Sequence, residues 1–148
     1  MNKTIFFILI LKAIIIAISS CNPVNPLPYQ RKWKAKMVKE NNTIVYDMGS
    51  NNNLYPAYQN FLLDLSDTSI VTLREFTGQS MTGKWRIIDS GNSGKSLRLS
   101  QLLPQPEQSG GVIEYFVKKD PPEELILVNT KANPKTGNSI NEYVLIPQ

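Results

Sequence analysis

The sequence predicts an all-β protein, an antiparallel up-and-down meander that closes into a barrel of about eight strands. Short runs alternate apolar and polar side chains from Arg31 almost to the C-terminus, which is the period of a half-buried strand. Turn-forming Gly, Pro, Asn, Asp and Ser separate these runs. No stretch has the period of an amphipathic helix of about ten or more residues. Many short, evenly spaced strands are typical of a sandwich or barrel.

The first expected strand covers residues 31–39, where lysines alternate with Trp33, Ala35 and Met37. This period of two predicts a strand with one solvent-exposed face. Its lysines either protect a sheet edge or contact anionic lipid headgroups. A turn at Asn41 and Asn42 leads to a short strand, 43–46. The polar stretch 49–60 is expected to form a loop, or one helical turn, at a barrel mouth.

The chain then becomes regular. The further expected strands cover residues 61–65, 70–76, 81–88, 96–102, 112–118, 125–129 and 140–146. Alternation along the strands predicts one inward-facing set: Trp33, Met37, Phe61, Leu63, Leu65, Val71, Leu73, Met81, Trp85, Ile87, Leu97, Leu99, Ile113, Tyr115, Val117, Leu125, Leu127, Tyr143 and Leu145. An eight-stranded barrel has room for its own side chains or for one small ligand, so in a tight barrel these residues fill the interior and a ligand is confined to the mouth.

The N-terminal stretch indicates where the protein lies in the cell. Lys3 precedes an apolar run, residues 5–18, which Lys12 interrupts. A bilayer span needs about 20 apolar residues, so this run fits a signal peptide better. Ile18-Ser19-Ser20-Cys21 resembles the lipobox of bacterial lipoproteins. The resemblance implies cleavage between Ser20 and Cys21 and acylation of Cys21 with fatty acids such as palmitate; cleavage elsewhere and an uncleaved anchor are the alternatives.

The domain organisation follows from this leader. Residues 1–20 are the expected lipoprotein signal peptide, residues 21–30 a Pro/Asn-rich tether, and residues 31–148 the barrel domain. The tether has three prolines between Asn22 and Pro28, which favour an extended polyproline conformation. A loop packed against the barrel is the alternative.

The composition excludes several classes of chemistry. Histidine is absent, which removes the commonest general base and metal ligand. Without Lys3 and Lys12, fourteen basic residues face twelve acidic ones, a net charge of +2, so we expect no nucleic-acid partner. Residues 91–96 have the wrong glycine spacing for a phosphate-binding loop, and 135–137 lack the nucleophile that a β-lactamase requires. We therefore predict no enzyme activity, no catalytic residues, no metal and no cofactor.

The run 61–102, with Gly83-Lys84-Trp85 at its centre, resembles a passage of small lipocalin-like bacterial lipoproteins. Lipocalins also place a G-x-W motif at the start of the first strand. Here that position reads Arg31-Lys32-Trp33, so the tryptophan matches and the glycine does not. The resemblance implies a lipocalin-like barrel that binds a small hydrophobic or amphipathic ligand.

Two functions are thus expected. The first is a membrane-tethered, lipocalin-like binding protein. Its candidate ligand-lining residues are Trp33, Tyr55, Tyr58, Phe61, Trp85, Tyr115 and Tyr143. The alternative is a non-enzymatic interaction or structural lipoprotein, with a filled barrel and an envelope protein partner. Asn22 is not the aspartate that retains some lipoproteins at the inner membrane, and no acidic run follows Cys21. We therefore expect the bacterial outer membrane, with the domain facing the periplasm. A cavity of about 300 Å³ or more would favour the binding protein.

Overall fold

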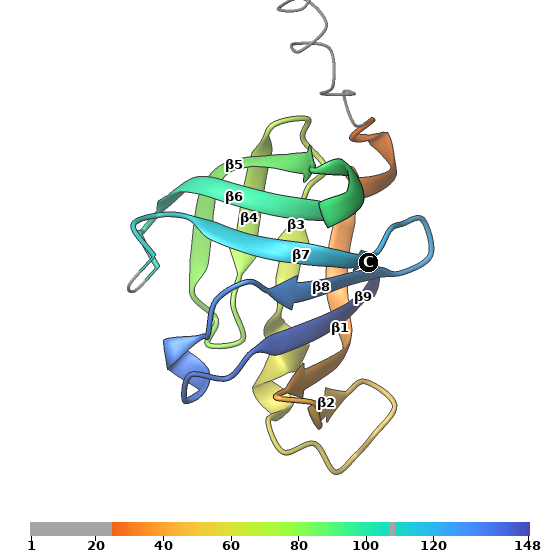
Figure 1. Ribbon diagram of the computed structural model, residues 1–148. Helices are drawn as coiled ribbons and strands as arrows, with labels where there is room; N and C mark the ends of the chain where they lie inside the picture. The colour runs from red at the N-terminus through yellow and green to blue at the C-terminus, as the bar shows by residue number, and fades with distance from the viewer. Residues whose placement is uncertain (1–24, 107–108) are drawn as a thin grey trace, which may run out of the picture.

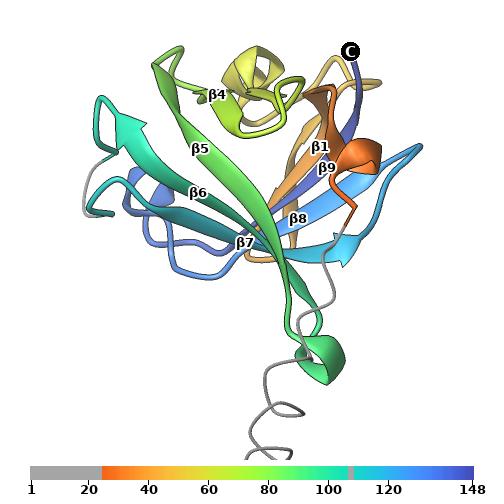
Figure 2. The ribbon, with the colours of Figure 1, turned by 90° about the horizontal axis from the view of Figure 1, so that it is seen from above.

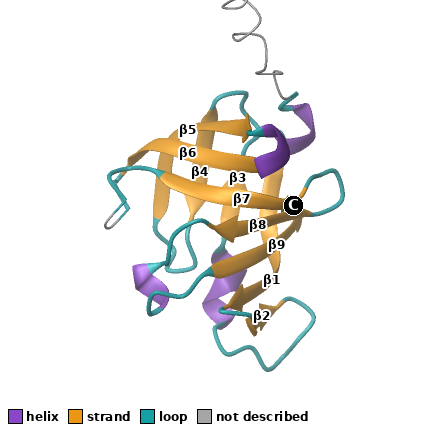
Figure 3. Ribbon diagram, in the orientation of Figure 1, coloured by secondary structure: helices purple, strands orange, loops and turns teal. Residues whose placement is uncertain are grey.

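The computed structural model describes residues 25–106 and 109–148; the predicted signal peptide, its cleavage site and Cys21 lie outside this part of the chain. Nine strands and four one-turn 3-10 helices make up the described secondary structure (Figures 1 and 3). The strands are β1 (Lys32–Glu40), β2 (Thr43–Asp47), β3 (Leu62–Asp64), β4 (Ile70–Arg74), β5 (Ser80–Asp89), β6 (Lys95–Leu103), β7 (Ile113–Lys119), β8 (Leu125–Asn129) and β9 (Asn141–Pro147). The helices are η1 (Leu27–Tyr29), η2 (Pro56–Asn60), η3 (Gly91–Ser93) and η4 (Pro134–Thr136).

The strands form one closed antiparallel sheet. From β3 to β9 each strand pairs with the next, and β9 pairs with β1 to close the barrel. The other edge of β1 is shared, because its first half pairs with β3 and its second half with β2. Eight strands therefore make the barrel and β2 is an addition. Figure 2 shows the sheet curving round until β1 and β9 lie side by side. The predicted up-and-down, lipocalin-like barrel is confirmed.

The hairpin between β1 and β2 shows how local sequence sets this path. Asn41 and Asn42 both have positive φ, at 47° and 71°. Asparagine tolerates this left-handed conformation, which a two-residue hairpin turn requires. The turn sends β2 back along β1, so β2 occupies the edge of β1 that β3 leaves free.

The core lies inside the barrel and follows the predicted alternation with one exception. Met37 was expected to face inward, and this prediction was wrong. A bulge between Ala35 and Met37 shifts the register against β9, so Val38 is buried and Met37 is only partly buried. A bulge adds one residue to one strand and so reverses the direction of the side chains that follow it.

The barrel has two different ends. At the first, which we call the η1 end, η1 packs over the opening and Tyr29 is buried. Trp33 Nε1 donates a hydrogen bond to the Tyr29 carbonyl at 2.9 Å, and the Tyr29 hydroxyl bonds Asp120. The last residues of the Pro/Asn-rich segment therefore pack against the barrel, as the alternative to an extended tether predicts. At the other end, the loop end, the chain segments 48–61, 75–79, 104–112 and 130–140 connect the strands.

Candidate functional site

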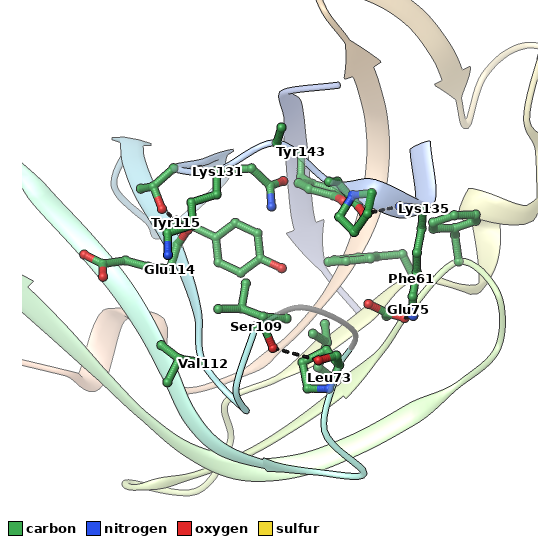
Figure 4. Close-up of a pocket in the computed structure, with 18 of the residues that line it drawn as sticks. Phe61, Leu73, Glu75, Ser109, Val112, Glu114, Tyr115, Lys131, Lys135 and Tyr143 are labelled. Carbon is green, nitrogen blue, oxygen red and sulfur yellow. Dashed lines mark hydrogen bonds and ion pairs between the residues drawn. The ribbon is translucent and has the colours of Figure 1, made fainter. Parts of the chain in front are cut away.

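A cavity of about 580 Å³ opens at the loop end (Figure 4). Its walls come from β4, β6, β7, β8 and β9, from Phe61 just before β3, and from the three loops that join β4 to β5, β6 to β7 and β8 to β9. Four aromatic residues belong to its lining: Phe61, Phe76, Tyr115 and Tyr143. The cavity therefore lies inside the barrel and opens where the loops end.

The aromatic rings contact one another in defined geometries. Phe61 and Tyr143 are stacked, with ring centroids 4.7 Å apart and an interplanar angle of 21°. Tyr115 meets Tyr143 edge to face, with centroids 6.0 Å apart. Both arrangements suit the electrostatics of aromatic rings. Because Tyr115 and Tyr143 occupy inward positions on β7 and β9, strand alternation alone directs both rings into the barrel.

A buried polar cluster fixes the loop that precedes β9. Asn141 is 0% exposed, and its Nδ2 donates to the hydroxyls of Tyr58 at 3.0 Å and Tyr143 at 3.3 Å. Its Oδ1 accepts from the Ser139 hydroxyl at 2.6 Å. The Tyr58 hydroxyl in turn donates to Glu40 at 2.6 Å. This cluster satisfies its buried polar groups and anchors one wall of the cavity.

Ion pairs connect the loops around the cavity. Lys135, in η4, pairs with Glu75 at the end of β4, and both side chains are mostly buried. Arg98 and Glu114 form a looser pair at 4.0 Å between β6 and β7. Lys131 also lines the cavity and makes no ion pair with the described residues. The rim is thus polar, although the walls below it are aromatic.

The two tyrosines that line the cavity remain protonated at neutral pH. Burial raises the pKa of Tyr143 to about 12. Burial also raises the pKa of Tyr115 well above its ordinary value, and the nearby Tyr143 and Glu75 raise it further. Both side chains are therefore neutral phenols that can donate a hydrogen bond.

Three of the seven predicted lining residues meet in this cavity: Phe61, Tyr115 and Tyr143. Tyr58 lies behind the wall, buried against Phe76 with ring centroids 4.7 Å apart. The other three predicted residues do not line it.

Trp33 and Trp85 are buried toward the η1 end, where Trp85 Nε1 donates to the Asp67 carbonyl at 2.9 Å. Tyr55 is 51% exposed on the surface. Aromatic character therefore identified candidates without telling which end of the barrel each one occupies.

Sequence reasoning missed the polar residues of the wall. Glu75 continues the inward alternation of Val71 and Leu73. Asn129 continues that of Leu125 and Leu127 in the same way. The period of two could therefore have predicted that both side chains face the interior. Phe76 lies in a turn and Lys135 in the one-turn helix η4, where the period of a strand does not apply.

No group of three or more His, Cys, Asp or Glu side chains in the described residues could hold a metal ion. Within the same part of the chain, no helix is both long and apolar enough to cross a bilayer. No protein-family model, curated protein or solved structure matches this chain.

Proposed function

We propose that this protein is a membrane-tethered lipoprotein whose lipocalin-like barrel binds a small hydrophobic or amphipathic ligand, without catalysing a reaction. The observation that carries the proposal is the aromatic-lined cavity of about 580 Å³ at the loop end. Small-molecule sites are concave, mostly apolar and about 300–1,000 Å³ in volume. The cavity lies within that range.

The distribution of core residues supports a site at one end only. Trp33, Leu125 and Leu145 are 0% exposed and pack the interior toward the η1 end. A ligand therefore occupies the loop end and meets stacked aromatic rings at its apolar part. The polar rim stays in contact with water, which suits an amphipathic molecule. A filled structural barrel, the alternative function, would not need this hollow half.

The tether belongs to the same proposal. Cys21 is acylated after cleavage at Ser20, and the protein faces the periplasm from the outer membrane. Two or more acyl chains suffice for stable anchoring, whereas a single chain binds reversibly. Residue Asn25, which accepts a hydrogen bond from Leu27, precedes η1 at the η1 end. The cavity would therefore open away from the bilayer, toward soluble ligand donors or acceptors.

Ligand binding is tested with a lipophilic fluorescent probe and the full chain carrying Cys21→Ser, which needs no detergent for its acyl groups. We expect saturable binding that Val112→Trp weakens at least about tenfold, because an indole at this lining position fills the cavity. Val128→Trp is the matched control, since Val128 faces outward from β8. Equal binding by both variants, or no saturable binding at all, contradicts a ligand site in this cavity.

Membrane attachment is tested separately. Labelled palmitate should mark the wild-type protein and not the Cys21→Ser variant. The variant should also leave the membrane fraction. An unchanged fractionation of the variant would contradict the tether and leave the cavity unaffected.

A further inference from the structure

Two polar side chains in the cavity wall carry a group that has no hydrogen-bond partner among the described residues. Among the described residues, nothing accepts from or donates to the Tyr115 hydroxyl, although Tyr115 is 3% exposed. Asn129 Oδ1 is buried and likewise has no partner within the described part of the chain. The two residues are direct cross-strand neighbours on β7 and β8. Tyr115 lines the cavity, so a molecule bound there can supply the partner that its hydroxyl lacks.

The other tyrosines of this region show the contrast. The hydroxyls of Tyr58 and Tyr143 both accept from Asn141, so the fold satisfies them. Figure 4 shows the Tyr115 ring extending from β7 with its hydroxyl directed into the cavity. Tyr115 therefore presents an unused polar group to any molecule that enters.

The two side chains differ in the group that they leave unpaired. The Tyr115 phenol keeps its proton, because burial and the neighbouring Tyr143 and Glu75 raise its pKa. The unpaired group of Asn129 is its Oδ1, which can only accept a hydrogen bond. The Tyr115 hydroxyl can donate to an acceptor on a bound molecule, and a carbonyl oxygen is such an acceptor.

The surrounding charge favours a neutral acceptor. Glu75, the residue directly after β4, lies near Tyr115 and Tyr143, and its charge opposes ionisation of both phenols. Lys135 already forms an ion pair with Glu75, and Arg98 forms one with Glu114. Lys131 is exposed at the rim. A carboxylate placed at the Tyr115 hydroxyl would lose its hydration near Glu75, whereas Lys131 is exposed to solvent, and burial of an unpaired charge is costly.

We propose that the cavity binds a neutral, ring-shaped amphipath whose carbonyl oxygen accepts a hydrogen bond from the Tyr115 hydroxyl. The stacked rings of Phe61 and Tyr143 favour a planar body for this ligand. This proposal rests on the proposed function, because it names the ligand class of the same site.

Three probes of matched shape test the proposal. The first, 2-acetylnaphthalene, is a neutral ketone. In 2-isopropenylnaphthalene a methylene group replaces the carbonyl oxygen, and 2-naphthoate carries a carboxylate. Dissociation constants are measured by calorimetry on the full chain carrying Cys21→Ser. We expect 2-naphthoate to bind more weakly than the ketone.

We also expect Tyr115→Phe to weaken ketone binding about three- to tenfold, which is the net worth of one neutral hydrogen bond. The dissociation constant of 2-isopropenylnaphthalene, which has no carbonyl oxygen, should change by less than about twofold in the same variant. Tyr46→Phe is the matched control, because Tyr46 is buried outside the cavity and its loss of a hydroxyl should affect none of the probes.

The carbonyl stretch of bound 2-acetylnaphthalene gives an independent measurement. We expect a lower infrared frequency in the wild-type pocket than in alkane solvent, and a return toward the alkane value in Tyr115→Phe. Unchanged ketone affinity and frequency in Tyr115→Phe would overturn the proposal, as would tighter binding of 2-naphthoate. Both outcomes leave ligand binding itself intact. If none of the three probes binds to the wild-type cavity, the proposed function fails instead.

Discussion

Single residues decide how the loop end of the barrel is held, and Asn141 is the central one. It lies on β9 at an inward position, where the sequence suggests only another strand residue. In the structure it contacts two tyrosine hydroxyls and Ser139. An amide with every group satisfied inside a core fixes one arrangement of its neighbours, because any other arrangement would leave a polar group unpaired.

We predict that Asn141→Ala lowers the free energy of unfolding by about 2–3 kcal/mol, because buried hydroxyls lose their partners. Urea denaturation measures the change. Asn92→Ala, at an exposed position of η3, is the control and should change stability by less than about 0.5 kcal/mol. Equal effects of the two variants would contradict the role of Asn141.

The bulge in β1 leads to a second prediction at this scale. Simple alternation assigns Met37 to the core, whereas the structure buries Val38 completely. Val38→Ala should therefore cost about 1.5–3 kcal/mol of unfolding free energy, since it leaves a cavity among packed side chains. Met37→Ala should cost less than half as much. A larger effect at Met37 would show that β1 runs without the bulge.

At the scale of elements, close contact between β5 and β6 depends on a missing side chain. Gly83 lies on β5 beside an irregularity in its pairing with β6. A Cβ at Gly83 would lie 2.5 Å from the Ser100 carbonyl oxygen, which is far closer than atoms pack. Backbone cannot move aside as a flexible side chain can, so only glycine allows the two strands to approach this closely.

Gly83→Ala should therefore destabilise the barrel by about 1–3 kcal/mol, the usual cost of forcing extra atoms into packed structure. Gly49→Ala is the matched control, because a Cβ there makes an ordinary contact 3.5 Å from Asp47 Oδ1. Thermal unfolding compares the two variants. A Gly83→Ala melting temperature equal to that of the control would mean that β5 and β6 separate without cost.

At the scale of the whole molecule, ion pairs on the outer surface connect strands far apart in sequence. Glu142 on β9 pairs with Lys39 on β1 at 2.9 Å and with Lys118 on β7 at 2.6 Å. Glu124 pairs with Lys36 and Lys119. Hydrogen bonds from Lys118 and Lys39 lower the pKa of Glu142, and those from Lys36 and Lys119 lower the pKa of Glu124 to about 2. The seam between β1 and β9 thus carries charge-assisted contacts.

These lowered pKa values predict the acid sensitivity of the protein. A carboxyl group with a lower pKa in the folded state stabilises the fold above its unfolded pKa, and that stabilisation is lost as pH falls through the folded value. For Glu124 the window runs from about pH 4.5 down to about pH 2. The melting temperature should therefore fall across this range.

Glu142→Gln should lower the melting temperature at pH 7 and make its fall on acidification shallower, because one of the linked groups has been removed. Glu123→Gln is the control, since Glu123 is exposed and forms no ion pair with the described residues. Thermal unfolding between pH 7 and pH 2 measures the melting temperature of both variants. If the melting temperature of Glu142→Gln falls as steeply on acidification as that of the control, the ion pairs of Glu142 do not contribute to acid sensitivity.

Much of the barrel follows from local information in the chain. The period-two runs place every strand, and the turn residues between them separate antiparallel neighbours, because alternation and turn chemistry act over a few residues. The same alternation directs Phe61, Tyr115 and Tyr143 toward the interior. Fold class and three members of the cavity were therefore predictable.

The remainder depends on contacts between segments far apart in sequence. Closure of β9 on β1 decides that the barrel has eight strands and that β2 lies outside it. Trp33 and Tyr115 both face inward, yet only the arrangement of strands sends one to the packed η1 end and the other to the hollow loop end. The period of a strand specifies the side that a residue faces, but its height in the barrel, and the partners it meets there, depend on register between strands.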